Sequence, residues 1–128
     1  MGRKGVTLDQ AVRQRVELLH SRDRHEEIVR LLEQLEQPDA ESSSLLARAY
    51  NNLGRYEDAV RLLLAAPQSE DPMWHFRLGY AWFYQERYQE ALQEFEETLQ
   101  LLPGDEDAML FAGCCRQELE AARERETA

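Results

Sequence analysis

The chain is poor in the residues that break or cross-link a fold. Its 128 residues include two cysteines, four prolines and six glycines. The cysteines, Cys114 and Cys115, are adjacent, and on a helix they would point about 100° apart and pair only with strain. We therefore expect two free thiols in a reducing, cytoplasmic compartment.

Long apolar runs and excess positive charge are absent as well. No run approaches the roughly 18 residues of a membrane span, and no apolar stretch follows the opening "MGRKGVTLDQ", so we expect neither a membrane segment nor a signal peptide. The net charge of −10 would repel nucleic acid and anionic membranes. Residues 1–30 are mildly basic, with seven Lys/Arg against five acids, and the remainder carries eight against twenty.

Patterns typical of catalysis or metal binding are missing too. His20, His25 and His75 show no metal-ligand spacing, and Cys114-Cys115 lacks the two-residue spacer of zinc and redox motifs. The chain has no phosphate-binding glycine loop and no nucleophile elbow. We expect no enzyme activity, no cofactor and no metal.

The residues that are present predict helices throughout. Leu, Ala, Glu, Gln and Arg dominate, and apolar residues recur at intervals of three and four. Loop-forming stretches fall at 37–44, 66–72 and 102–107. We expect an all-α fold of about seven helices without a sheet, at 9–21, 25–36, 41–53, 56–65, 73–85, 88–101 and 106–123.

Three stretches carry helix-start signals. Ser42 to Ser44 can cap one helix. Asp71-Pro72 places a capping residue before a proline at the first helical position. Pro103-Gly104-Asp105 can end one helix and cap the next.

An internal repeat organises these helices. "RYQEAL" at 87–92 matches "RYEDAV" at 55–60 after a shift of 32, and "RHEEIV" at 24–29 after a further 31. Under the same shifts Gly79 falls on Ala47, and Gly113 lies 34 positions beyond Gly79. Each repeat is then a pair of helices joined by a short turn.

Small and bulky residues alternate in the third repeat. We interpret Gly79 and Ala91 as the positions where its two helices cross closely, because a larger side chain would force them apart. Trp82, Tyr88 and Phe95 would fill the space around that crossing.

This arrangement resembles the tetratricopeptide repeat. The third repeat carries the pattern of that family as Leu78-Gly79, Trp82, Ala91, Phe95 and Pro103. The second repeat matches with Leu46-Ala47, Tyr50, Ala59 and Leu63, and the first departs from the pattern with Val16 and Ile28. The resemblance implies one domain over 1–128, an α-solenoid forming a right-handed superhelix, with repeats at about 9–39, 40–71 and 72–105 and a capping helix at about 106–123.

The resemblance also implies a function and a surface. Domains of this family bind peptides or protein segments in a concave groove lined by the first helix of each repeat, and they are rarely catalytic. In the closing helix the groove positions include Leu110 and Cys114. The candidate groove residues of the repeats are Arg13, Arg48, Asn51, Asn52, Phe76, Tyr80, Phe83 and Tyr84.

Other interpretations stay open at this point. Phe76 and Phe83 could belong partly to the core, and the asparagines could simply solvate an open face. The chain could instead be a structural assembly subunit, a homodimer that pairs through exposed helix faces. The repeats also resemble those of small bacterial proteins found near toxin–immunity gene clusters.

Overall fold

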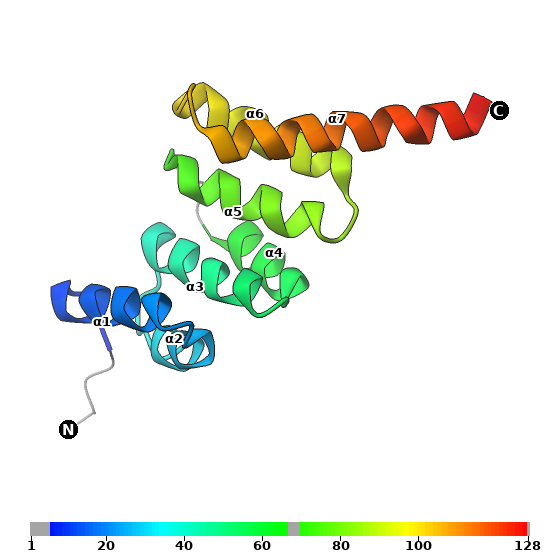
Figure 1. Cartoon of the computed structure of the whole chain (residues 1–128). Coiled ribbons are helices and arrows are strands. Elements are labelled where there is room, and N and C mark those ends of the chain that lie inside the picture. The colour runs from blue at the N-terminus through cyan, green and yellow to red at the C-terminus, as the bar shows by residue number, and fades with distance from the viewer. Residues whose placement is uncertain (1–5, 67–69, 128) are drawn as a thin grey trace. The chain divides into compact units, whose positions relative to one another are not determined.

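The computed structural model describes residues 6–66 and 70–127, which form seven α-helices (Figure 1). The only β-type pairing in these residues is an isolated parallel bridge between Val6 and Leu35, so the predicted all-α class is confirmed. The helices are α1 (Gln10–Ser21), α2 (His25–Leu32), α3 (Ala40–Asn52), α4 (Tyr56–Ala65), α5 (Pro72–Phe83), α6 (Tyr88–Leu101) and α7 (Glu106–Thr127).

The chain divides into two compact units between its second and third repeats. The first unit, described over residues 6–66, contains α1 to α4, and the second unit, described over residues 70–127, contains α5 to α7. Within each unit, helices that follow one another in the chain pack together. This nearest-neighbour packing is what a repeat architecture requires.

Acidic side chains cap the starts of α5 and α7. The Asp71 carboxylate accepts a hydrogen bond from the Met73 N–H, with Pro72 at the first helical position, as the sequence predicts. The Asp105 carboxylate likewise accepts from the Ala108 N–H at the start of α7.

The prediction that Ser42 to Ser44 cap α3 is right only for Ser42, which shares the cap with Asp39. The cap of α3 is Asp39, whose carboxylate accepts from the Ser42 N–H at 2.8 Å, while the Ser42 hydroxyl accepts from the Asp39 N–H at 2.8 Å. This reciprocal pair is a capping box, which satisfies two backbone donors at once and so starts the helix earlier. Ser43 and Ser44 are instead buried inside α3.

Two helix ends differ from the prediction by four residues. Helix α2 stops at Leu32 rather than 36, because the Glu36 N–H donates to the Val6 carbonyl and Leu35 bridges to Val6. Helix α7 continues to Thr127 rather than 123, because its last turns contain no helix breaker.

The turn inside each repeat has a common geometry. One residue adopts a left-handed backbone in each turn: Asp23 with φ 57°, Gly54 with φ 75° and Glu86 with φ 61°. Glycine takes this conformation without strain, whereas Asp23 and Glu86 adopt it at some cost. The arginine that follows donates from Nε to an acid three positions on, in the pairs Arg24–Glu27, Arg55–Asp58 and Arg87–Glu90.

The crossing of α5 and α6 explains the alternation of small and bulky residues. A Cβ atom placed on Gly79 would lie 2.9 Å from Cε1 of Phe95, which is closer than real Cβ contacts. Ala91 and Phe95 are fully buried in the same cluster. The structure confirms that Gly79 marks the close approach, and it identifies the Phe95 ring as the group that Gly79 admits.

The two helical glycines of the second unit should respond oppositely to the same substitution. Gly79→Ala should destabilise the chain by about 1–2 kcal/mol, because overpacking against Phe95 outweighs a helix-propensity gain of about 1 kcal/mol. Gly113→Ala should stabilise it by about 0.5–1 kcal/mol, because no atom lies within 4 Å of the added Cβ. Urea unfolding monitored by circular dichroism measures both, and equal shifts in the two variants would contradict the α5–α6 packing.

Candidate functional site

Five aromatic rings gather on one side of the second unit. Phe76, Tyr80, Phe83 and Tyr84 come from α5 and its C-cap, and Phe111 comes from α7. Ring centroids lie 4.7 Å apart for Tyr80–Tyr84, 5.5 Å for Tyr80–Phe111 and 5.0 Å for Phe83–Phe111. We call these five residues the aromatic cluster.

The rings of the aromatic cluster differ in exposure. Tyr84 is 47% exposed, and the other four are half-buried. Phe76 and Phe83 pack against the buried core around Ala91 and Phe95, so the interpretation of these two as partly core is confirmed. Tyr84 is therefore the member of the aromatic cluster best placed to meet a partner.

The predicted arginines of the first unit each contact an acid on a neighbouring first helix. Arg13 on α1 makes a two-pronged contact with the Glu41 carboxylate on α3, with N–O distances of 2.8–3.2 Å. This hydrogen bonding raises the pKa of the Arg13 guanidinium. Arg48 on α3 lies 2.9 Å from Glu17 on α1. Any acidic ligand group would have to compete with Glu17 or Glu41 for these arginines.

The two predicted asparagines have different surroundings. Asn51 is only 6% exposed, whereas Asn52, the last residue of α3, is exposed. A side-chain amide that is exposed to solvent can hydrogen-bond a ligand's backbone without any rearrangement of the protein. Of the pair, Asn52 is the better candidate.

The negative charge of the chain is concentrated in the second unit. Residues 70–127 contain fourteen Asp/Glu and five Arg, a net charge of −9, whereas residues 1–66 contain eleven acids and ten Lys/Arg, a net charge of −1. The described part of the second unit is thus strongly acidic overall.

The histidines have structural contacts. The His75 ring Nδ1 lies 2.8 Å from the Glu94 carboxylate on α6, and the His20 and His25 rings meet edge-to-face at 5.5 Å. Within residues 6–66 and 70–127, no group of three His, Cys, Asp or Glu side chains could hold a metal ion. His25, expected to take a packing role, has a side chain only 12% exposed.

The two cysteines should react at different rates. Both are free thiols; Cys115 is fully buried and Cys114 is half-buried. Burial, reinforced by the neighbouring Cys114, raises the pKa of Cys115 to about 11. Because the thiolate is the reactive form, a disulfide reagent at pH 8 should label Cys114 first in the native protein and both thiols after unfolding. Finding no reactive thiol in the unfolded, unreduced chain would instead indicate a disulfide between them.

The fold defines a class of protein, an α-helical domain built from repeated helix pairs. The residues 44–106 match the family model of the tetratricopeptide repeat. The structure is similar to the first TPR domain of the human RPAP3 protein, with a TM-score of 0.78 and 17% sequence identity over 88% of this chain and 93% of that one. No curated protein sequence matches the chain significantly.

The chain thus carries the tetratricopeptide repeat pattern in sequence over residues 44–106 and shares the fold of a TPR domain over most of its length. Repeats of this family form protein–protein interaction modules and are typically non-catalytic scaffolds. None of the helices in the described residues has the length and apolarity needed to cross a membrane.

Proposed function

We propose that the chain binds a peptide or protein segment on the inner faces of its first helices, and that the aromatic cluster anchors it. The observation that carries this proposal is Tyr84, a ring 47% exposed that leans on Tyr80 at 4.7 Å and on Phe83 at 5.2 Å. A tyrosine supported in this way offers apolar area and a polar tip at low entropic cost.

The rest of the predicted groove would supply orientation. Asn52 would hydrogen-bond a ligand backbone. Arg13 and Arg48 would leave their present partners and pair with an acidic group of the ligand. The net charge of −10 supports a protein partner over nucleic acid or an anionic membrane. The free thiols of Cys114 and Cys115 support a cytoplasmic location.

The test removes the exposed ring and the exposed amide together. A partner captured from lysate with the parent chain is identified, purified and titrated by calorimetry. Tyr84→Ala combined with Asn52→Ala should weaken its binding by roughly 2 kcal/mol or more, the scale of interface hot spots. Circular dichroism should show an unchanged helical spectrum.

A matched control uses an exposed apolar residue elsewhere. Leu64 on α4 is 60% exposed, and Leu64→Ala should leave the titration unchanged. If the double variant binds as tightly as the parent, the partner does not use the predicted groove.

Self-association is the alternative function, and the exposure of Leu64 and of Leu110, at 60% and 64%, favours it. In that case the chain would be an assembly subunit that pairs through helix faces. Sedimentation of the purified chain distinguishes the two, because a groove-binding module remains a monomer until its partner is added.

A further inference from the structure

Helices α5 and α7 present the same repeat positions, 34 residues apart. His75, Gly79 and Trp82 on α5 correspond to Met109, Gly113 and Arg116 on α7. We call the latter three the open face of α7. Because the two sets occupy equivalent positions, the contacts of α5 indicate which side chains of a neighbouring helix can pack on the open face of α7.

Helix α6 and its N-cap Arg87 contact all three residues of the α5 set. The Glu94 carboxylate meets His75 at 2.8 Å, and the Phe95 ring lies against Gly79. The Arg87 guanidinium lies 5.3 Å above the Trp82 ring. Later α6 residues meet earlier α5 residues, so the covering helix runs antiparallel.

The open face of α7 has no such cover within the described residues. Met109 is 56% exposed, and a Cβ added to Gly113 would meet no atom within 4 Å. Arg116 is exposed as well. Helix α7 continues straight to Thr127 instead of turning back as α5 does at α6 (Figure 1).

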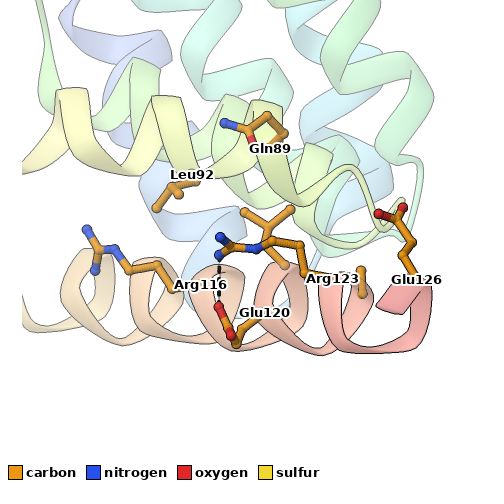
Figure 2. Close-up of a pocket in the computed structure, with 8 residues that line it drawn as sticks. Gln89, Leu92, Arg116, Glu120, Arg123 and Glu126 are labelled. Atoms are coloured by element: carbon orange, nitrogen blue, oxygen red, sulfur yellow. Dashed lines mark hydrogen bonds and ion pairs between the residues drawn. The ribbon is translucent and has the colours of Figure 1, made fainter. Parts of the chain in front are cut away.

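A cavity of about 690 Å³ adjoins the open face, between α6 and the second half of α7 (Figure 2). Leu92 extends from α6 toward α7, and Leu119 and Ala122 add apolar lining from α7. Arg116 and Glu120 belong both to this lining and to the side of α7 that carries Gly113. The cavity therefore extends the open face toward the C-terminus of α7.

The charges around this surface are mostly negative. Its two arginines each lie near an acid, Arg116 at 3.9 Å from Glu96 and Arg123 at 2.8 Å from Glu120. Glu106 and Glu124 share the helical side of Gly113 by their spacing, and the whole second unit has a net charge of −9. A positively charged occupant is complementary to such a surface.

We propose that the open face of α7 and its cavity dock a basic amphipathic helix from a partner protein. The helix lies antiparallel to α7, as α6 does on α5, and places an aromatic ring over Gly113. Leu119 lies six residues, about 9 Å, beyond Gly113. A second apolar residue, about seven positions before the aromatic residue of the docked helix, then enters the cavity. The same spacing separates Tyr88 from Phe95 in α6.

A synthetic peptide with this chemistry serves as the probe. It has the sequence of residues 87–101, with lysine replacing the four exposed residues Gln93, Glu96, Glu97 and Gln100. Fluorescence anisotropy with the full chain should show saturable binding. The same peptide with Phe95→Ala should bind at least about tenfold more weakly. The peptide that keeps the original residues in place of the lysines should also bind at least about tenfold more weakly.

Protein variants locate the site. Gly113→Leu fills the space meant for the ring and should weaken probe binding at least about tenfold, while the open space at Gly113 lets the variant fold. Glu118→Leu adds the same side chain at another exposed position of α7 and should leave binding unchanged. Tyr84→Ala should also leave it unchanged, which keeps this test independent of the groove proposal.

Three results would overturn the proposal. The first is that the probe does not bind, and the second is that Gly113→Leu and Glu118→Leu bind it equally well. The third is that the chain forms a dimer in sedimentation that Gly113→Leu abolishes, which would assign the open face to a second copy of the chain.

Discussion

Replacing Phe95 with alanine should lower the free energy of unfolding by about 3–5 kcal/mol, the range for large-to-small changes in a packed core. The Phe95 ring is fully buried, stacks on Phe111 at 5.2 Å and meets Phe76 edge-to-face at 5.5 Å. Gly79 has no side chain that could move into the space left behind, so a cavity would persist. Urea unfolding at neutral pH measures the change.

Gln93 provides the control on the same helix. Its side chain is exposed, and Gln93→Ala should change stability by no more than about 0.5 kcal/mol. A loss below about 1 kcal/mol for Phe95→Ala would mean that the ring does not fill the α5–α6 crossing.

Ala91→Leu should destabilise the chain by about 1–3 kcal/mol or more, because it overpacks the core where Phe95→Ala leaves a cavity. Ala91 is fully buried in the cluster that holds Phe95, Ala112 and Cys115, and three extra carbon atoms cannot enter without displacing a neighbour. Gln93→Leu makes a leucine two positions away and should cost little. Equal melting temperatures for the two variants would show that the phase of α6 is wrong.

The sequence locates the helices well because their limits are set locally. Asp71 and Asp105 cap their helices by hydrogen bonds to backbone N–H groups no more than three residues away. The repeat adds further evidence, because the same turn occurs three times in the sequence. One end that was predicted wrongly depends on a distant partner. Helix α2 ends early because Val6, far back in the chain, pairs with Leu35. The N-cap of α3 is Asp39, three residues before the first predicted serine, and it forms a reciprocal pair with Ser42.

The candidate site was predictable in its residue types and less so in its contacts. Repeat spacing brings the rings of α5 to one side, but Phe111 belongs to a different helix, and its place among them depends on the rotation of α7. The partners of Arg13 and Arg48 lie 28 and 31 positions away. No local rule pairs residues at such separations, although both are close to one repeat length and the alignment of repeats contains the signal.

The division of charge between the units gives the chain a preferred way to meet its partners. With −9 on residues 70–127 and −1 on residues 1–66, a cationic protein diffusing nearby is drawn to the second unit before any short-range contact forms. Association of such a protein should therefore be fastest in dilute buffer and slow steeply as added salt shortens the Debye length to about 8 Å. For a partner docked on rings and apolar side chains, as proposed, the dissociation rate should change far less. Ionic strength would then set how quickly the chain binds a basic partner rather than how long the complex lasts.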